Sequence, residues 1–576
     1  MKKLFKTIII LLLAAFFTDC SQAQEDTDSG LFEYKEIYLP HGITDASKLG
    51  LNNVDNDWGI WGHNLSKVLP KNVSLSIYAA VGGTRNKEQF CFSSDQLYKY
   101  LEDYIDDNYS NSKTQRFAIL PNDNSLVCQC DLCKQAGNTA TDASAAVHNL
   151  IRRLAERFPH HLFFTSYYQS TKSLPKEQMP ENTGVLVSAM DYPLSTMGSE
   201  QEDQFFALLK SWKQHMSRVY VWDYIQNFDD YFTPFPIFNV MQRRIWNYAQ
   251  CGVSGIFLNG SGSDYSCMNR VRTYVLADLL KDPTHDWKPL ITKYCHQFYP
   301  TAGDEIASYI YLLEASNAKY GKPLPMYEGM EKILYTYFLP EEFSPFHIRL
   351  TDLYHQTPDK EERERLALLV QAMSFTRLEI KRINKHIHDG TAELMSQLEE
   401  LSANKINYYS ESYWSIFDYT REYREMIEHD LAYGDKNLLK GVKLVPLTTL
   451  DEDYNDISIL TDGQLGLPSN YHCGQMLSSA DPALRIAIPV VSGMKKLRVS
   501  FTKNAIFRIA LPTNVTLSVG GVQIASKVPQ PSPKAPNRST VEFNIPASAS
   551  GNLVLTVVRN KAVKTMALDE IEGFEN

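Results

Sequence analysis

The stretch FAILPNDNSLVCQCDLC, from Phe117 to Cys133, joins a short apolar run, a carboxylate and three cysteines. The run Phe117–Leu120 predicts a strand that breaks at Pro121 into a polar turn carrying Asp123. In α/β barrels, loops at the carboxyl ends of the strands present the functional groups. Clustered cysteines hold a loop that lacks a core of its own, through a disulfide or a metal. We therefore predict that this loop presents Asp123 at a functional site.

Strand and helix patterns alternate from Trp58 to about Ser266. The predicted strands are Ser74–Ala80, Phe117–Leu120, Leu162–Tyr168, Gly184–Ala189, Arg218–Trp222 and Ser254–Leu258, and the predicted helices are Thr141–Phe158, Gln201–Met216 and Ile237–Gln250. This alternation predicts a multi-domain α/β protein with a TIM-like (β/α) barrel, rather than a doubly wound sheet. Only six or seven strands can be counted, which leaves open an incomplete barrel or one closed by irregular N-terminal segments. No GxGxxG motif follows a strand, which argues against a dinucleotide site.

The remaining segments differ in sequence pattern from the barrel, which we place at residues 58–320. Residues 321–436 are helical almost throughout and are predicted to form a helical extension of the barrel. Residues 437–576 have short alternating segments separated by Pro, Gly and Ser, and predict a C-terminal β-sandwich. Its predicted strands are Leu497–Phe501, Phe507–Leu511, Val515–Val519, Val522–Ala525 and Leu553–Val558. Residues 24–57 remain as an N-terminal segment.

The composition is that of a globular protein and excludes one class of partner. The chain has 576 residues, too many for one core, and 44% of them are hydrophobic. Its formal net charge of -10 argues against nucleic acid as a partner, because that would need a basic surface.

The N-terminus predicts export. MKKLFKTIIILLLAAFF starts basic and continues into an apolar run that is too short to span a bilayer, as in a signal peptide. We expect residues 1–23 to be the signal peptide, cleaved before Gln24. Alternatively, Cys20 is lipidated as in bacterial lipoproteins, which would tether the protein to a membrane. The sequence is compatible with both cleavage before Gln24 and lipidation of Cys20.

Polar clusters follow the predicted strands and are expected to converge on one face of a barrel. A glycoside-hydrolysing site needs two carboxyl groups, one protonated and one ionised, and Asp123, Asp191 and Asp223 are available. Each of them could instead cap a helix or hold a loop. His63 could bind a substrate hydroxyl or be a structural histidine, and Arg85 could pair with a substrate carboxylate or with a nearby Asp. The full set of predicted substrate-binding residues is Trp61, His63, Arg85, Asn122, Asp191, Tyr192, Trp222, Tyr224 and Asn259.

The cysteine cluster admits two interpretations. Cys128, Cys130 and Cys133 have metal-ligand spacing, and Cys91 could be the fourth thiolate of a structural zinc site closed to substrate. In an oxidising compartment, Cys91 could instead form a disulfide with one of the three. We expect no cofactor for catalysis.

Five segments carry a resemblance to a known family. WGIWGHNL, IYAAVGGTRNKEQFCFSS, LPNDNSLVCQCDLCK, VWDYIQNFDDYFTPFP and GVSGIFLNG, within Trp58–Leu313, resemble a bacterial family named by a domain of unknown function and classed as glycoside-hydrolase-like. That family resembles α-glucuronidase and β-hexosaminidase barrels and occurs mainly in polysaccharide-degrading gut bacteria. The resemblance maps its acidic strand-end residue onto Asp123 and its WDY motif onto Asp223. Together with the predicted export signal, the occurrence of the family in such bacteria implies a periplasmic or outer-membrane-tethered protein of a Gram-negative bacterium. The C-terminal domain is similar to galactose-binding-like sandwiches.

Two departures from the family favour a second hypothesis. Only about thirty residues separate the signal peptide from the first motif, where relatives usually carry a small α/β domain, and Asn259 is an amide where relatives often have an acid. The first hypothesis is a secreted or surface-tethered glycoside hydrolase acting on a complex polysaccharide or oligosaccharide through Asp123 and Asp223. The alternative is a non-catalytic glycan-binding protein with a degenerate barrel. The hydrolase hypothesis fails if no two carboxyl groups line one cleft.

Overall fold

The computed structural model describes residues 30–40, 46–531, 535–563 and 565–575. The predicted signal peptide and the predicted lipidation site Cys20 lie outside these residues. Within the described part of the chain, no helix combines the length and the apolar character needed to cross a membrane.

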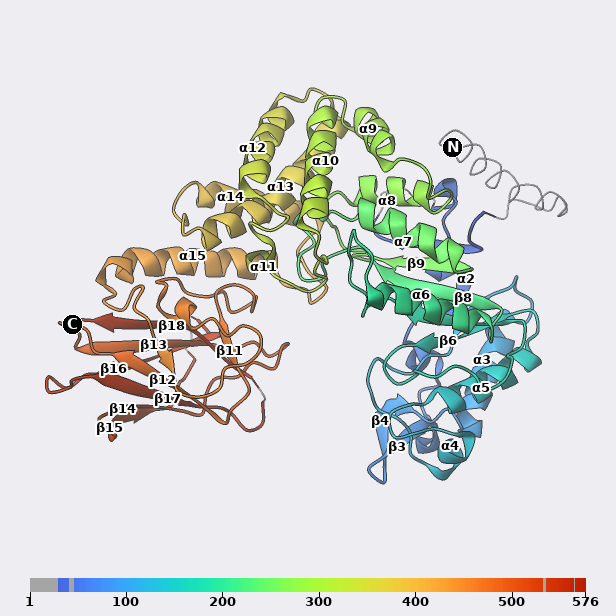
Figure 1. Cartoon of the computed structure of the whole chain (residues 1–576), viewed down its shortest axis with the longest axis horizontal. Coiled ribbons are helices and arrows are strands. Elements are labelled where there is room, and N and C mark those ends of the chain that lie inside the picture. The colour runs from blue at the N-terminus through green and yellow to red at the C-terminus, as the bar shows by residue number, and fades with distance from the viewer. Residues whose placement is uncertain (1–29, 41–45, 532–534, 564, 576) are drawn as a thin grey trace, which may run out of the picture.

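A curled sheet of seven parallel strands forms the centre of the N-terminal half (Figure 1). In spatial order its strands are β1 (Tyr34–Tyr38), β9 (Gly255–Asn259), β8 (Arg218–Tyr224), β7 (Thr183–Ser188), β6 (Leu162–Tyr167), β5 (Arg116–Ala118) and β2 (Trp58–Ile60). All neighbouring pairs are parallel, and the order is that of a (β/α) barrel. Within the described residues, the edge strands β1 and β2 do not pair with each other. The predicted barrel is therefore confirmed in its coarse form, as a curled half-barrel sheet with helices, and not as a closed barrel.

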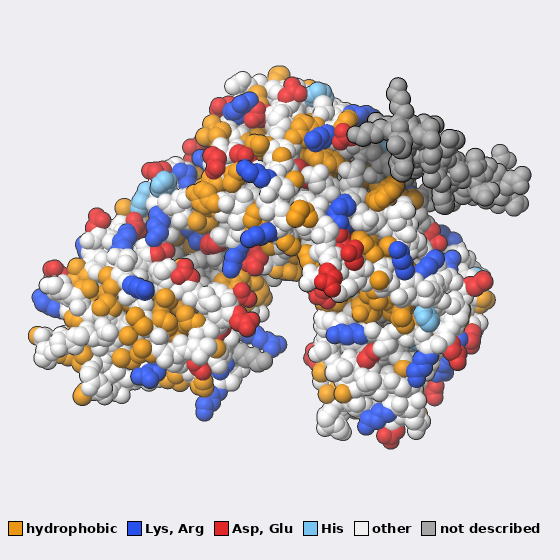
Figure 2. All heavy atoms as spheres, viewed as in Figure 1, with side chains coloured by type: hydrophobic (Ala, Val, Ile, Leu, Met, Phe, Trp, Pro, Cys, Tyr) orange, Lys and Arg blue, Asp and Glu red, His pale blue; other side chains and the backbone are white. Residues whose placement is uncertain are grey.

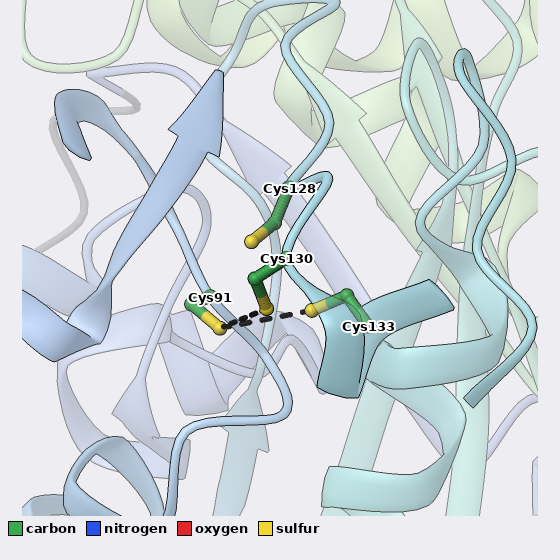
Figure 3. Close-up of side chains that lie close together, drawn as sticks. All are labelled: Cys91, Cys128, Cys130 and Cys133. Atoms are coloured by element: carbon green, nitrogen blue, oxygen red, sulfur yellow. Dashed lines mark hydrogen bonds between the residues drawn. The ribbon is translucent and has the colours of Figure 1, made fainter. Parts of the chain in front are cut away.

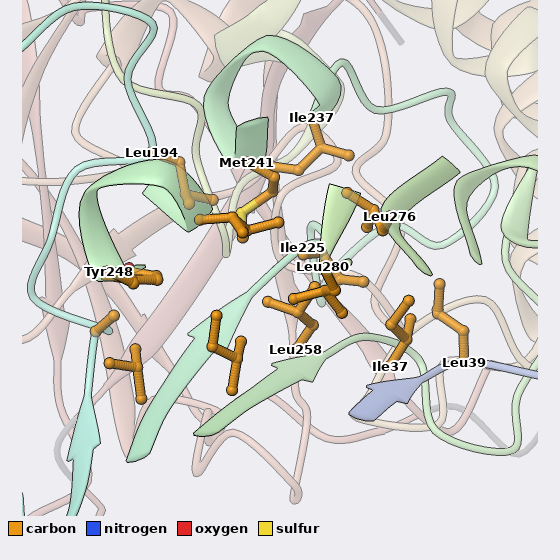
Figure 4. Close-up of a cluster of buried hydrophobic side chains, with 14 of the residues drawn as sticks. Ile37, Leu39, Leu194, Ile225, Ile237, Met241, Tyr248, Leu258, Leu276 and Leu280 are labelled. Carbon is orange, nitrogen blue, oxygen red and sulfur yellow. The ribbon is translucent and has the colours of Figure 1, made fainter. Parts of the chain in front are cut away.

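The two faces of this sheet bury different side chains. The outer face packs aliphatic residues, among them Ile37 and Leu258, against helices (Figure 4). These helices are α3 (Asp95–Tyr109), α5 (Ser144–Arg157), α6 (Glu200–Lys213), α7 (Phe238–Gln250) and α8 (Asn269–Leu279). The inner face buries a separate aromatic cluster that includes Trp58 and Tyr220. Successive residues of a strand point to opposite faces, so each strand supplies both clusters in alternation.

One predicted strand of the sheet is wrong. Within Ser74–Ala80, Leu75–Ile77 form a 3-10 turn, and β3 (Tyr78–Val81) pairs with β4 (Thr84–Phe90) in a separate antiparallel hairpin. The turn residues Gly82 and Gly83 have φ of 59° and 82°, a conformation that suits a tight hairpin turn and favours glycine. The hairpin therefore lies beside the sheet instead of within it.

The sheet also begins earlier than the predicted start at residue 58, because β1 lies in the segment 24–57. The sequence of β1, YKEIY, is not apolar enough to be recognised as a strand. Its Glu36 is buried, where the Tyr34 hydroxyl donates to Oε2 and the Val54 amide donates to Oε1 at 3.1 Å. Glu36 interrupts the apolar pattern of the sequence although it belongs to the core, because its hydrogen-bond partners compensate the burial of its carboxyl group.

The helical region is continuous with the sheet and is not a separate appendage. Its helices are α9 (Trp287–Phe298), α10 (Gly303–Tyr320), α11 (Met330–Ile333), α12 (Pro340–Gln356), α13 (Lys360–Ile383), α14 (Thr391–Glu399) and α15 (Ile416–Tyr433). Buried residues of α10, α12 and α13 share one core with α7 and α8. The loops before α11 and before α15 return to the carboxyl ends of the parallel strands.

Residues beyond α15 form two antiparallel sheets with a core of their own (Figure 1). The five-stranded sheet has the order β10-β12-β17-β14-β15 and the four-stranded sheet β11-β18-β13-β16. Their bounds are β10 (Val445–Pro446), β11 (Met476–Ser478), β12 (Ala483–Pro489), β13 (Lys496–Thr502), β14 (Asn514–Val519), β15 (Val522–Lys527), β16 (Arg538–Asn544), β17 (Asn552–Val558) and β18 (Met566–Phe574). The predicted strand Phe507–Leu511 is wrong, because only isolated bridges occur there.

A loop of the sandwich contacts the loop after β8. His472 Nε2 lies 2.8 Å from Asp229 Oδ2, and both side chains are buried. The Tyr454 hydroxyl lies 2.7 Å from His472 Nδ1. The surface is hollowed between the sandwich and the lobe that carries the β3–β4 hairpin (Figure 2).

Candidate active site

A cleft of about 220 Å³ lies at the carboxyl ends of the parallel strands. Its walls come from the loops after β2, β5, β6 and β7, from the ends of β8 and β9, and from two loops of the helical region. Two of its lining residues are carboxylic acids, Asp123 and Glu411. Aromatic rings of Tyr168, Trp222 and Tyr224 line it as well. This is the place where functional groups of parallel α/β sheets converge.

The backbone on both sides of Asp123 is fixed to strand β4. The buried Gln89 accepts from the Asn122 amide at 3.0 Å, and its Nε2 donates to the Asn122 carbonyl at 3.2 Å and to Asn124 Oδ1 at 3.0 Å. The side chains of Asn122 and Asn124 in turn donate to the carbonyl of Glu88, at 2.9 and 2.8 Å. Asn122 therefore holds the loop and does not line the cleft, and its role in substrate binding stays a prediction.

A strained residue holds the Asp123 carboxylate. Gln169 follows β6 with a positive φ of 45°, and its Nε2 donates to Asp123 Oδ1 at 2.5 Å. Positive φ is unfavourable for a residue other than glycine and persists where the surrounding structure imposes it. The side chain of Asp123 is otherwise exposed.

Glu411 reaches the cleft from the loop before α15. Its amide donates to the Phe228 carbonyl at 2.8 Å, which ties this loop to the one after β8. The hydroxyl of Tyr327, from the loop before α11, donates to Glu411 Oε2 at 3.1 Å. Both residues belong to the region predicted as an extension, and the sequence interpretation missed them. The available signal was the aromatic run YYSESYW, residues 408–414, which interrupts the helical pattern.

The environment of Glu411 favours its protonated form. Withdrawal of the carboxyl group from water raises the pKa of Glu411, and the hydrogen bond from Tyr327 opposes this rise. The negative charges of Asp229 and Asp123 raise it further. Glu411 can therefore carry a proton at a pH where an ordinary glutamate would have lost it.

Asp223 does not reach the cleft, and its predicted catalytic role is wrong. It lies on the outer face of β8 and is 0% exposed. Its carboxylate accepts from Arg244 Nη1 at 2.6 Å and from the Tyr248 hydroxyl at 2.5 Å, both on α7. Trp222 and Tyr224, on either side, point to the cleft because side chains alternate along a strand. Asp223 thus joins β8 to α7 by a buried ion pair.

One wall of the cleft is aromatic. It consists of Trp222 and Tyr224, and Trp61 packs against it. Trp222 and Tyr224 line the cleft, and the Tyr224 hydroxyl lies 3.3 Å from Ser188 Oγ. Trp61 is outside the lining and stacks on Trp222, with ring centroids 4.9 Å apart and planes at 12°. It therefore supports Trp222 from behind.

His63 and Asn259 line the cleft, as the sequence predicted. The Nδ1 of His63 lies 2.5 Å from the carbonyl of Pro121. A carbonyl only accepts, so Nδ1 carries the proton, and Nε2 of the neutral ring is left as an acceptor. His63 can therefore accept a hydrogen bond from a hydroxyl group.

Three other predicted residues lie elsewhere. Arg85 is exposed on the β3–β4 hairpin, where its guanidinium donates to the Tyr78 carbonyl at 2.7 Å, and it does not line the cleft. Asp191 and Tyr192 line a second hollow of about 590 Å³. This hollow shares Tyr168 and Ser188 with the first cleft, so the two adjoin.

The four predicted metal-site cysteines come together beside the Asp123 loop (Figure 3). Their Sγ atoms all lie within 4.8 Å of one another, and each cysteine is a free thiol in the structure.

Comparison with known proteins identifies a matching family for the first part of the chain. Residues 61–311 match the family described as "Domain of unknown function (DUF4838)". This span agrees with the resemblance expected over Trp58–Leu313, and it ends before most of the helical region and the sandwich. No curated protein matches the chain.

Several solved structures are similar at low identity. A family GH115 4-O-methyl-α-glucuronidase with specificity for decorated arabinogalactans is 11% identical over 84% of this chain and 67% of its own, with a TM-score of 0.35. A GH138 enzyme targeting pectin rhamnogalacturonan II is 8% identical over 98% of this chain and 88% of its own, with a TM-score of 0.31. A Streptococcus pneumoniae fucose binding module is 11% identical over 24% of this chain and 96% of its own, with a TM-score of 0.19. Because these scores are low, we base the function on the cleft itself.

Proposed function

We propose that this protein is a glycoside hydrolase that acts on a complex glycan, with Asp123 and Glu411 as its carboxyl pair. The observation that carries the proposal is that two carboxylic acids line one aromatic cleft. Glycoside hydrolysis needs such a pair, one group to protonate the leaving oxygen and one to act as nucleophile or base.

The environments assign the two roles. Glu411 is exposed at the cleft, but partial withdrawal of its carboxyl group from water raises its pKa, which suits a general acid. Asp123 accepts a hydrogen bond from Gln169 that orients its carboxylate, which suits a positioned nucleophile or base. Glu411 therefore protonates the glycosidic oxygen, and Asp123 attacks the anomeric carbon or activates a water.

Aromatic rings around the cleft suit a sugar ligand. Trp222 and Tyr224 form its wall, and Tyr327 at its rim is 41% exposed. Rings combine an apolar face with, in Tyr, a polar tip, so they can stack on the C–H face of a sugar and bind its hydroxyls. The adjoining hollow with Asp191, Tyr192 and Lys172 extends the site for further sugar units of a polysaccharide or oligosaccharide.

The second candidate function is glycan binding without cleavage. Asn259, at the end of β9, lines the cleft with an amide, which cannot serve as an acid or a base there and favours this alternative. In both cases the substrate or ligand is a glycan, and we propose that the protein is exported to meet it, with the sandwich as a further glycan-binding module.

A product screen separates the two functions. The wild-type protein, Asp123→Asn and Glu411→Gln are incubated with uronic-acid-containing and hexosamine-containing glycans, and released sugars are measured by chromatography. The hydrolase proposal expects release by the wild-type protein and loss in both variants. Binding of a glycan by all three proteins, with no release from it by any, would support glycan binding and overturn hydrolysis.

A further inference from the structure

Four thiols from three segments form a compact cluster beside the cleft (Figure 3). Cys91 follows β4, Cys128 and Cys130 lie in the loop after β5, and Cys133 lies in the short helix α4 (Asp131–Ala136). Cys91 Sγ is 3.6 Å from the Sγ atoms of both Cys130 and Cys133. Cys91, Cys128 and Cys133 are buried.

The spacing of the sulfur atoms fits a tetrahedral metal. A disulfide needs an S–S distance of about 2.05 Å. Zinc held by four cysteines at about 2.3 Å places its sulfurs about 3.8 Å apart. The observed contacts of 3.6 Å are close to the second value. We infer that Cys91, Cys128, Cys130 and Cys133 bind one zinc ion.

The backbone around the cluster is arranged to hold thiolates. Cys130 is the N-cap residue of α4 and Cys133 lies in its first turn, so the two side chains face the same side. The Ala80 amide donates to Cys128 Sγ at 3.2 Å, a contact that stabilises negative charge on the sulfur. Four protein sulfurs fill all positions of a tetrahedral ion, so the site is structural and closed to substrate.

The zinc ion fastens the hairpin to the loop that carries Asp123. An isolated two-stranded hairpin is marginally stable, and within the part of the chain that the structure describes, β3 and β4 pair only with each other. Cys91 lies two residues after Gln89, the residue that fixes Asn122 and Asn124. The other three ligands lie just beyond Asp123 in the sequence. The metal therefore adds a cross-link to the hydrophobic contacts, among them those of Phe90 and Val127, that hold this part of the molecule.

Metal analysis of the full chain tests the site. The protein is purified without added metal and dialysed, and metal is measured by inductively coupled plasma mass spectrometry. We expect one zinc per chain in the wild-type protein and in Cys251→Ser, a buried cysteine outside the cluster. Cys130→Ser and Cys133→Ser should lose it. A wild-type protein without metal, zinc that persists in both cluster variants, or iron in place of zinc would overturn the inference.

Two measurements on the wild-type protein cover the case in which the cluster variants fail to fold. Cobalt exchanged into the site should give thiolate charge-transfer bands and the visible bands of tetrahedral cobalt. Alkylation of unreduced protein, denatured with a chelator, should modify all four cysteines, including in protein recovered from an oxidising compartment. Disulfides among the four cysteines, with no cobalt bands, would overturn the zinc site and leave the proposed hydrolase function standing.

Discussion

Asp123 and Asp223 occupy corresponding places in the sequence, at the ends of two strands of one sheet, but opposite places in the structure. Asp123 lies in a loop, is exposed and lines the cleft. Asp223 lies within β8, is fully buried and binds Arg244 and Tyr248 on the helical side. The difference shows that a carboxylate near a strand end reaches the site only if it points to the inner face of the sheet or lies beyond the last strand residue.

The comparison separates two uses of a carboxylate. In the loop, the backbone holds Asp123 through Gln89 while its side chain stays available to a ligand. In the strand, the carboxylate of Asp223 is itself the structural element, since both of its oxygens are occupied. The pair for Asp123 therefore comes from Glu411, in a loop far along the chain.

The largest expected effect is on hydrolysis by Asp123→Asn. Removing a positioned carboxylate should lower kcat/KM by about 10²–10⁴-fold, because the amide cannot act as nucleophile or base. The exposed side chain contributes little to folding, so thermal unfolding should match the wild-type protein. Steady-state kinetics on a glycan identified by the screen provides the measurement, and wild-type kcat/KM in this variant would refute the role of Asp123.

Asp223→Ala should act on stability instead. Removing one partner leaves the Arg244 charge buried without compensation, which should lower the free energy of unfolding by about 3–5 kcal/mol. Urea denaturation measures this change. The control is Asp191→Ala, an exposed residue of the adjoining hollow, which should leave stability within about 0.5 kcal/mol of wild type. A stable Asp223→Ala protein that has lost activity would reverse our assignment of the two aspartates.

A smaller effect is expected for Gln169→Ala. The variant removes the solvent-exposed hydrogen bond to Asp123. Its loss should raise the activation free energy by about 1 kcal/mol and so lower kcat/KM about fivefold. Gln214→Ala, at an exposed position that lines neither the cleft nor the adjoining hollow, serves as the control. An equal loss in both variants would show that Gln169 does not act through Asp123.

The smallest effect concerns the pH profile of Tyr327→Phe. A general acid must be protonated, so activity falls as pH rises through the pKa of Glu411. The Tyr327 hydroxyl stabilises the ionised carboxylate and lowers the pKa of Glu411. Its removal should therefore move the alkaline limb of kcat/KM to higher pH. A shift to lower pH, or a displaced acid limb alone, would contradict this assignment.

Much of the sheet could be predicted from the sequence, because β5 to β9 are continuous apolar runs between turn residues. β1 could not, since its buried Glu36 is compensated by partners that the sequence does not reveal. Five of the thirteen residues that line the cleft could be predicted from the strand ends, namely Asp123, His63, Trp222, Tyr224 and Asn259.

The partner of Asp123 could not be predicted in the same way. Glu411 enters the cleft through tertiary contacts between loops, with Phe228 and Tyr327, and no local pattern encodes them. The error at Asp223 could have been avoided, because Trp222 and Asp223 are neighbours in a strand and cannot share a face. The alternation of side chains along a strand therefore assigns the two residues to opposite faces of the sheet.

The most direct test of the account is a double-mutant cycle on Asp123→Asn and Glu411→Gln, measured as kcat/KM for glycan hydrolysis. Residues that act as one catalytic unit have non-additive effects. We predict that the double variant is no slower than the slower single variant, and that all three proteins unfold like the wild type. Losses that multiply in the double variant, or wild-type activity in Glu411→Gln, would show that the two carboxyl groups do not form one catalytic pair.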